Sequence, residues 1–460
     1  MNKKIVSVLL CVALATTMLA GCSNNQTAET NKPEANEVET NEVETNETEE
    51  AEAKQTEANS ELKFDDVKLS IMMETGTDLT AFYPVADLIK EKLGIELEVE
   101  FRPAGSEGTN LIRTRLASGD MSDLLVYNVG SLTAALNPKE NFIDMTDSDL
   151  AATVDASFTS AASVDGRLYA VPSGSSSGGG VMYNKDVYEK YDLEVPKTWS
   201  EFIANMDILK EAGEVALIGS FADPWTAQVP FLADNYQVMH NDPNFATEFT
   251  AGEKKFADSV AFRSWEKLEA TQPYYNDDMM SITYDVACDM LAMGEGAHYI
   301  MTTGILQNIY TLYGLETVNK IGVFPVPGDT EEETGLTVWC AGGLYGNKES
   351  ANVDAVRAVM DFWNTDEALD IAVEHASPSG PFHNGYKLPD DVFDGVKDQV
   401  AYFDAGRTAP ALEFLTPVKG ANCDAISAEL VTGQTTAKEA AEAYDQDCIK
   451  MAVQLGLDWN

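Results

Sequence analysis

The sequence predicts an α/β protein whose length suits two or three domains. Two observations carry this prediction. Between residues 67 and 127, short apolar segments alternate with amphipathic segments, the pattern of parallel strands joined by helices. Near the middle of the 460-residue chain, residues 173–180 are all serine or glycine, which predicts a flexible crossing of small residues with open backbone amides. The hydrophobic share of 44% is sufficient for packed cores.

The first lobe is expected to begin with a buried strand over residues 67–73. An amphipathic helix follows and ends at Gly94. Residues 95–101 alternate as a second strand, the next helix ends near Gly119, and residues 124–127 form a third strand. Strands that are joined through helices pair in parallel, by right-handed crossovers, so the three strands should be parallel.

Local signals also flank the serine and glycine run. Residues 164–167 read Val-Asp-Gly-Arg, which is typical of a tight hairpin turn. Thr198 and Glu201 form a capping box, so a helix is expected from about Trp199. Gly213 can end that helix.

This region resembles the hinge of family 1 extracellular solute-binding proteins, the sugar-binding lipoproteins of ABC importers related to maltose-binding protein. The motifs that carry the resemblance are Tyr-Ala-Val-Pro at 169–172, Tyr-Asn-Lys-Asp at 183–186 and Pro-Lys-Thr-Trp-Ser-Glu-Phe at 196–202. Further similar segments lie at 294–304, 321–327 and 336–343. The resemblance spans most of residues 62–460 and is weakest over 377–416.

The resemblance implies a type II periplasmic-binding-protein fold with an interlobe cleft and three hinge crossings. The crossings are expected near residues 170–173, 324–327 and 345–350. The implied domains are a lipoprotein signal peptide at 1–21, an acidic disordered tether at 22–61, a first lobe at 62–171 and 326–347, and a second lobe at 172–325 and 348–460.

The N-terminus has the features of an export signal. Two lysines precede the apolar residues 5–18, which are too few to span a bilayer comfortably. The following Leu-Ala-Gly-Cys at 19–22 resembles a bacterial lipobox, which implies lipid attachment at Cys22 on the outer face of the cytoplasmic membrane. The alternative is an ordinary secretory signal with an incidental cysteine. The repetitive, acidic residues 23–61 are expected to be a spacer, or else a partner-binding tail.

Charge excludes one class of partner. The chain has 30 Lys and Arg against 76 Asp and Glu, a net charge of −46, which repels nucleic acid. This charge fits either solubility outside the cell or a cationic ligand. Four cysteines, Cys288, Cys340, Cys423 and Cys448, have spacings that fit no metal site, and they leave both disulfides and buried thiols open.

The second-lobe site is predicted around Trp225, which follows an expected strand at 215–220. Its indole is a flat surface for a sugar ring, with Asp223 and Gln228 as hydrogen-bonding neighbours; the alternative is a tryptophan that anchors a helix in the core. Trp339 could stack on the ligand or pack in the core. Gly304 is included because the family's corresponding segment meets the ligand. The family often has an aromatic residue two positions later, where this chain has Leu306.

The first-lobe site is predicted at the carboxyl ends of the parallel strands, where open α/β sheets bind ligands. Glu74, Asp78 and Asn128 lie there, and solvated turns or helix caps are the alternative. Ser175 in the crossing could offer a hydroxyl group. The run lacks the Gly-Lys-Ser/Thr ending of a phosphate loop. His383 and Arg407 lie in the weakly matched region and receive no role.

The function implied by the resemblance is a monomeric receptor that captures an oligosaccharide and delivers it to ABC permease subunits, without cofactor, metal or catalysis. No histidine cluster or nucleophile elbow points to an enzyme. The alternatives are a receptor for a peptide, polyamine or other non-sugar solute, and a surface-anchored carbohydrate-active enzyme.

Overall fold

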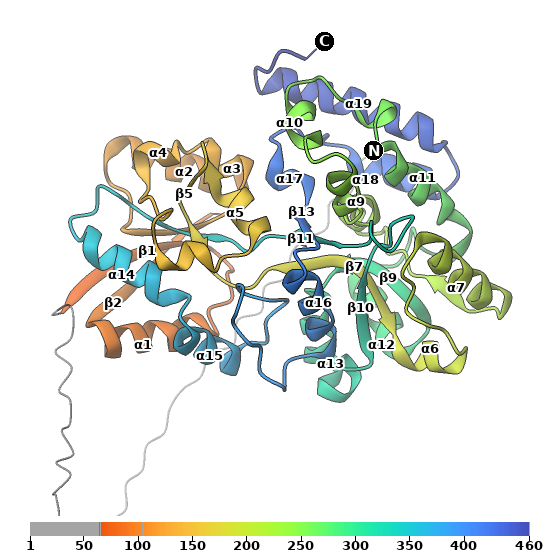
Figure 1. Cartoon of the computed structure of the whole chain (residues 1–460), viewed down its shortest axis with the longest axis horizontal. Helices are drawn as coiled ribbons and strands as arrows, with labels where there is room; N and C mark the ends of the chain where they lie inside the picture. The colour runs from red at the N-terminus through yellow and green to blue at the C-terminus, as the bar shows by residue number, and fades with distance from the viewer. Residues whose placement is uncertain (1–63, 65, 104, 460) are drawn as a thin grey trace, which may run out of the picture. The chain divides into compact units, whose positions relative to one another are not determined.

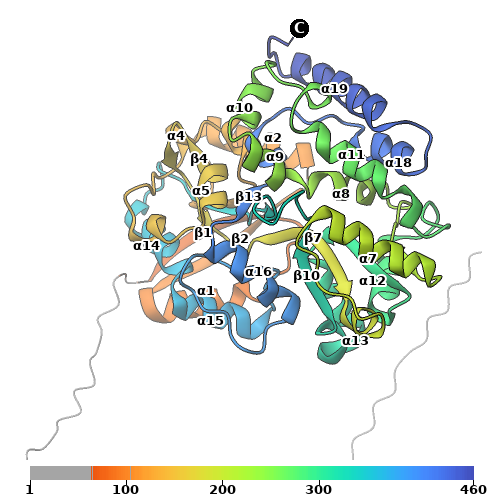
Figure 2. The same cartoon turned by 45° about the vertical axis from the view of Figure 1, so that its right-hand side comes forward.

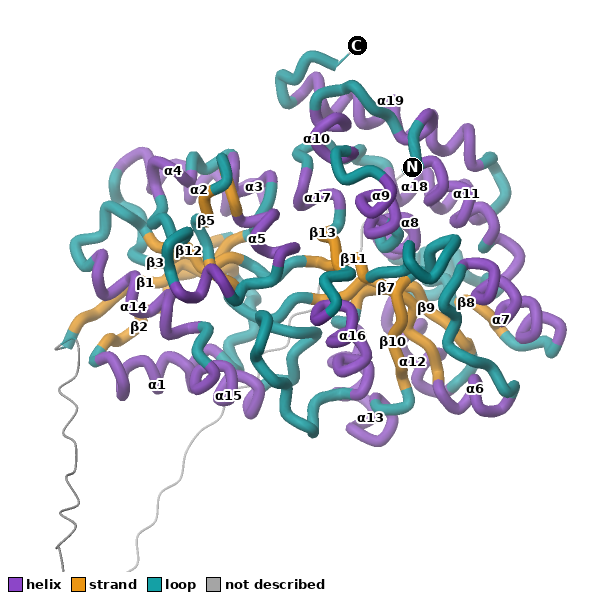
Figure 3. The backbone as a smooth tube through the Cα atoms, in the orientation of Figure 1, coloured by secondary structure: helices purple, strands orange, loops and turns teal. Residues whose placement is uncertain are grey.

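The computed structural model describes residues 64, 66–103 and 105–459. The predictions for the signal peptide, for Cys22 and for the tether lie outside these residues. Two large sheets organise the described chain (Figure 3). Each of them has its own hydrophobic core. The predicted α/β fold with two sheet-containing lobes is therefore confirmed. Among the described residues, none of the helices has the length and apolar character needed to span a bilayer.

The first sheet has five strands. Its order is β2 (Ile95–Arg102), β1 (Val67–Glu74), β3 (Leu124–Tyr127), β12 (Gly343–Gly346) and β6 (Val171–Pro172). β1 is parallel to both β2 and β3, as the alternating sequence predicts. β12 is antiparallel to β3 and β6. The three parallel strands therefore end at the same edge of the sheet.

Helices cover both faces of this sheet (Figures 1 and 2). They are α1 (Phe82–Leu93), α2 (Gly105–Ser118), α3 (Ser131–Ala134), α4 (Pro138–Asn141), η1 (Asp149–Ala152), α5 (Ala156–Ala162), α14 (Val353–Trp363) and α15 (Asp366–His375). The predicted hairpin turn forms between β4 (Ser163–Val164) and β5 (Arg167–Leu168). Asp165 and Gly166 both have positive φ, 52° and 74°, as a type I′ turn requires.

The assignment of residues 348–460 to the second lobe is wrong for α14 and α15. Val356, Val359, Met360 and Ala368 are fully buried in the first core. α14 is amphipathic, and amphipathicity requires burial of one face without specifying which core provides it. The choice of lobe is made by packing alone.

The second sheet lies around β7. Its order is β13 (Thr408–Pro410), β11 (Leu336–Trp339), β7 (Ser177–Asn184), β9 (Gly296–Thr302) and β8 (Val215–Leu217), and β10 (Ile321–Pro325) also pairs with β7. β10 and β11 are both antiparallel to β7, at its two ends. Residues 326–339 therefore continue the second lobe, and the prediction that they belong to the first is wrong.

The helices of the second lobe form two groups. Around the sheet lie α6 (Lys185–Lys190), α7 (Trp199–Glu211), α12 (Tyr284–Met293), α13 (Ile305–Val318) and α16 (Asp394–Asp404). A second group with its own core comprises η2 (Pro224–Gln228), α8 (Val229–Leu232), α9 (Asn235–Asn241), α10 (Phe245–Thr250), η3 (Phe256–Asp258), α11 (Phe262–Ala270), η4 (Gln272–Tyr274), α17 (Leu412–Leu415), α18 (Cys423–Val431) and α19 (Ala437–Gln454). α10, α11, α18 and α19 lie together in Figures 1 and 2. The predicted capping box at Thr198 is confirmed at the start of α7.

The described chain passes between the two cores in three segments: residues 173–176, 340–342 and 376–387. The segments are joined to one another, because Ser173 N donates to Gly342 O over 2.9 Å and Ser379 N donates to Ser175 Oγ over 3.0 Å. The first lies beside its predicted place. The crossings expected near 324–327 and 345–350 are wrong, because those residues belong to or directly follow paired strands of a single sheet.

Candidate functional site

The strand directions define where a ligand can bind. In the first sheet β1, β2 and β3 end at one edge, and the crossing at 173–176 leaves from the end of β6 at that same edge. In the second sheet β8, β9, β11 and β13 run in one direction, antiparallel to β7. Their ends therefore lie at the edge where β7 begins. Both edges adjoin the crossings, and carboxyl ends of strands are where open α/β sheets bind ligands.

Trp225 lies on this edge of the second lobe and outside the core. It belongs to η2, which follows β8, and its side chain is 46% exposed. Its ring lies 5.4 Å from that of Tyr284, tilted by 45°. Asp223 joins the two segments, because its Oδ2 accepts a hydrogen bond from Tyr284 N, at the start of α12, over 2.7 Å. The alternative of a buried helix anchor is therefore excluded by the exposure of the indole.

The other second-lobe candidates differ in what they offer. Gln228 ends η2 and is half-buried, and Gly304 precedes α13 at the end of β9. Leu306, two positions later, is 1% exposed and belongs to the core beneath the sheet. This position therefore presents no aromatic platform to a ligand.

Trp339 is held in place on two sides. One part of its ring lies over Gly179, where an added Cβ would come within 2.0 Å of the indole carbons. Its Nε1 donates to Glu413 Oε1 over 2.9 Å, and Glu413 in turn pairs with Lys419 at 2.5 Å. The half-buried ring at the end of β11 is thus fixed in orientation, with core packing accounting for one of its faces.

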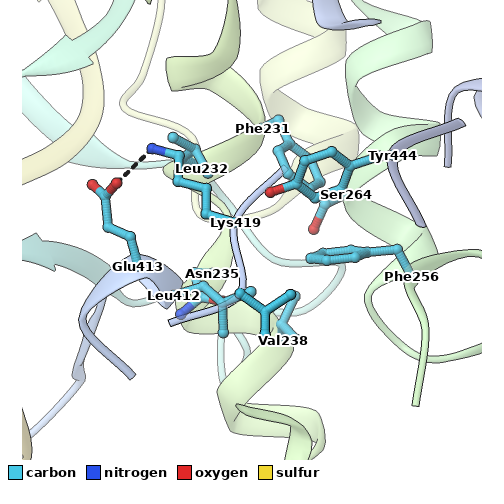
Figure 4. Close-up of a pocket in the computed structure, with 11 residues that line it drawn as sticks. Phe231, Leu232, Asn235, Val238, Phe256, Ser264, Leu412, Glu413, Lys419 and Tyr444 are labelled. Atoms are coloured by element: carbon cyan, nitrogen blue, oxygen red, sulfur yellow. Dashed lines mark hydrogen bonds and ion pairs between the residues drawn. The ribbon is translucent and has the colours of Figure 1, made fainter. Parts of the chain in front are cut away.

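A small cavity lies beside this ion pair. Figure 4 shows Glu413 and Lys419 pointing toward one another on one side, with Phe256 and Tyr444 on the other. The cavity volume is about 20 Å³, which is enough for about one water molecule. It therefore cannot hold a sugar ring, and its residues stabilise the helical group behind Trp339.

Two of the predicted first-lobe residues line one cavity of about 360 Å³, Glu74 at the end of β1 and Asn128 just after β3. The pairing of β1 with β2 places Glu74 directly beside Arg102, whose Nη1 donates to Glu74 Oε2 over 2.9 Å. Arg102 and Arg113 also line this cavity, and sequence reasoning missed both. The available signal for Arg102 was its place as the last residue of an alternating strand.

Asp78 and Ser175 line a different cavity, of about 230 Å³, beside the first crossing. Hydrogen bonds from Thr80 hold the pKa of Asp78 below its ordinary value, which keeps this exposed carboxylate charged. Ser175 Oγ is occupied by Ser379 N, so this hydroxyl ties the first crossing to the third. The nine predicted site residues therefore lie in separate places along the two edges.

The remaining unassigned residues have structural contacts. Arg407 donates to the carbonyl groups of Glu331 and Thr334. His383 contacts Asn364 O through Nε2 over 3.2 Å, which links the third crossing to the first lobe. The four cysteines in the described residues are all free thiols.

Two sheets with facing carboxyl edges, joined by adjacent crossings, define the class of two-lobed solute-binding proteins. Residues 75–370 match the family described as bacterial extracellular solute-binding protein. The chain belongs to this family, whose members serve ABC importers outside the cytoplasm.

Similarity to individual members is lower. An uncharacterized ABC transporter extracellular-binding protein of Pyrococcus horikoshii is 22% identical over 55% of this chain and 59% of its own length. The multiple sugar-binding protein of Streptococcus mutans is 24% identical over 30% of this chain and 32% of its own length. The matches thus span between about a third and three fifths of these relatives.

Solved structures of other proteins match this chain over a larger share of its length than these two relatives do. RafE of Streptococcus pneumoniae in its apo form has a TM-score of 0.70 at 15% identity, covering 84% of this chain and 98% of RafE. RafE in complex with raffinose has a TM-score of 0.65 at 16% identity, covering 84% and 99%. At such identities the likeness shows a shared fold.

Proposed function

We propose that the protein is a lipid-anchored receptor that captures a carbohydrate between its lobes and delivers it to the permease of an ABC importer. The observation that carries this proposal is the half-exposed Trp225, which pairs with Tyr284 at the carboxyl edge of the second sheet. Sugars bind aromatic faces through their C–H surfaces and bind polar groups through their hydroxyls. Asp223, Glu74 and Asn128 lie along the two edges and supply such polar groups.

The crossings support a closing motion. Residues 173–176 and 340–342 join the two edges directly and share a hydrogen bond, so the ends of both sheets stay close to the hinge. Rotation about these segments brings the edges together and encloses a bound ligand. The permease would then recognise the closed form. Two relatives support a sugar as the ligand, since one is described as a multiple sugar-binding protein and another is solved with raffinose.

The test combines a ligand screen with a matched pair of variants. Thermal shift with a panel of oligosaccharides identifies a ligand, because binding raises the apparent stability by mass action. Trp225→Ala should then weaken binding by about 2–4 kcal/mol, the range for an interface hot spot, or roughly 30- to 1000-fold. Its loss of stability should stay below the roughly 3–5 kcal/mol of a buried tryptophan.

Tyr310→Ala is the matched control. Tyr310 lies on α13, is 41% exposed, and its ring lies 5.1 Å from Phe393 with a tilt of 40°, much like the pair formed by Trp225 and Tyr284. This variant should bind the ligand normally by calorimetry. The role of Trp225 would be contradicted if Trp225→Ala bound the ligand as tightly as the wild-type protein. It would also be contradicted if both variants lost the same amount of affinity. If peptides or polyamines bind and none of the saccharides does, the proposal that the ligand is a carbohydrate is rejected.

A further inference from the structure

The first-lobe cavity at the carboxyl edge of β1, β2 and β3 gathers positive charge in a strongly acidic chain. We propose that the carbohydrate ligand is acidic and that Arg102 and Arg113 bind its carboxylate in this cavity; this proposal rests on the proposed function. The cavity volume of about 360 Å³ falls at the lower end of ordinary small-ligand sites. One sugar unit with its carboxylate is therefore the expected occupant, and the rest of the ligand extends toward the second lobe.

Arg102 is the first part of the argument, because it is a cation buried to an unusual degree. Its side chain is only 4% exposed, and within the described part of the chain its one acidic partner is Glu74, which is itself 41% exposed. Among the described residues its Nε has no hydrogen-bond partner. Its Nη1 also donates to Pro103 O over 3.1 Å. Burying a charged group is unfavourable unless it is paired and hydrogen-bonded, and one partly exposed carboxylate and one carbonyl group satisfy the guanidinium group incompletely.

The surroundings of Arg102 hold the guanidinium group in position. Its Cζ lies 5.0 Å from the centre of the Tyr127 ring, at the end of β3. Tyr127 is fixed by a 2.8 Å hydrogen bond between its hydroxyl and Thr109 Oγ1. Gly108 makes room on the other side, since a Cβ there would approach Arg102 Nη1 to 2.9 Å and Pro103 O to 2.0 Å. The guanidinium group therefore reaches the cavity in one orientation.

Arg113 supplies a second positive charge. Thr109, Asn110 and Arg113 are spaced so that they share one face of α2, and all three line the cavity. Arg113 forms neither a salt bridge nor a hydrogen bond within the described residues, although acids outnumber bases 76 to 30 in the chain. The cavity thus holds two cations and one carboxylate, Glu74, and one anionic group would complete it.

A carboxylate fits this arrangement better than a neutral hydroxyl. Guanidinium groups bind carboxylates through paired, charge-assisted hydrogen bonds that are about twice as strong as neutral ones. Asn110 and Asn128 line the same cavity and can bind the hydroxyls of the same sugar unit. The net charge of −46 does not prevent this, because distant exposed charges are screened over about 8 Å at physiological salt.

The experiment uses calorimetry with uronic-acid oligosaccharides, with the same oligosaccharides after reduction of their carboxyl groups, and with sulfated neutral oligosaccharides. The wild-type protein should prefer a uronic-acid oligosaccharide to its reduced form by about 10- to 150-fold, the range for hydrogen bonds to a charged group. Arg113→Gln should remove most of this preference, because the affinity for the reduced form should fall much less than the affinity for the uronic acid. Because Arg102→Gln can disturb folding, Arg113 carries the test.

Lys139→Gln is the matched control, because Lys139 is an exposed cation of the first lobe on α4, outside this cavity. This variant should keep the preference. Equal binding of the parent and reduced oligosaccharides, or an equal loss in Arg113→Gln for both, overturns the acidic ligand and leaves the proposed function standing. A preference for sulfated oligosaccharides would overturn the claim that the anionic group of the ligand is a carboxylate. Failure of all saccharides, with the protein folded, overturns the proposed function itself.

Discussion

Replacing Lys267 with methionine tests how the helical group is attached to the second sheet. Lys267 on α11 is 3% exposed, and its Nζ donates to Asp234 Oδ1 and to Pro327 O, each over 2.7 Å. It also donates to Gln237 Oε1, and its Nζ lies 5.3 Å from the ring centre of Trp199. One ammonium group thus joins α9, α11, the segment after β10 and the start of α7.

The expected loss follows from what the substitution leaves behind. Asp234 is 2% exposed on its side chain, and after Lys267→Met the one hydrogen bond left to this side chain from the described residues is that of Ser264 Oγ, over 2.7 Å. Breaking a buried ion pair in this way costs about 3–5 kcal/mol, because the remaining charge is unpaired. The free energy of unfolding, measured with denaturant and tryptophan fluorescence, should fall by this amount.

The loss should depend on pH in a stated direction. Burial raises the pKa of Asp234 above its ordinary value, and Lys267 opposes this rise. Without Lys267 the pKa rises further, so the folded variant holds the proton to higher pH than the unfolded chain does. Stability of the variant therefore decreases as the pH increases through that interval, and its deficit is smallest in acid.

The double variant, Asp234→Asn with Lys267→Met, separates charge from packing. The double variant removes both charges of this buried pair, so it should be more stable than Lys267→Met alone by about 1 kcal/mol or more. A single variant that loses less than about 1 kcal/mol, or a double variant no better than the single one, would refute the reasoning.

Two further predictions concern the start of α7 and the proposed membrane anchor. Thr198→Ala removes the side-chain oxygen that accepts from Glu201 N over 3.3 Å, so unfolding free energy should fall by about 1 kcal/mol; an unchanged denaturation midpoint would contradict the capping role. Cys22→Ala should release the protein from cells into the medium, because Cys22 is the proposed lipid site; continued retention in the membrane fraction would reject the lipobox.

The individual strands and turns of the first lobe could be predicted from the sequence. The apolar and alternating segments that became β1, β2 and β3 match their strands closely, since each depends on residues a few positions apart. The same holds for the turn at Asp165 and Gly166, and for the capping box at Thr198. In these cases the signal and the structure that it specifies lie within one short stretch of chain.

The candidate site was only partly predictable. Trp225 and Glu74 were predicted because they follow or end strands; Glu74 is the last residue of β1 and Trp225 lies in η2, after β8. Arg102 was missed, because its burial depends on contacts with Tyr127, 25 positions later, and with Gly108 on the next helix. Periodicity reports which face of a strand is apolar and carries no information about charges that neighbouring strands bring together.

The sequence by itself determined that this chain forms two α/β lobes, where the first lobe begins, and that the serine and glycine run leads into the second. Only the tertiary structure decided that β11 joins the second sheet, that β12 returns to the first, and that α14 packs on the first core. The physical reason is that strand pairing and helix packing join residues more than a hundred positions apart. Such contacts depend on the complementarity of complete surfaces, which local hydrophobic patterns leave open.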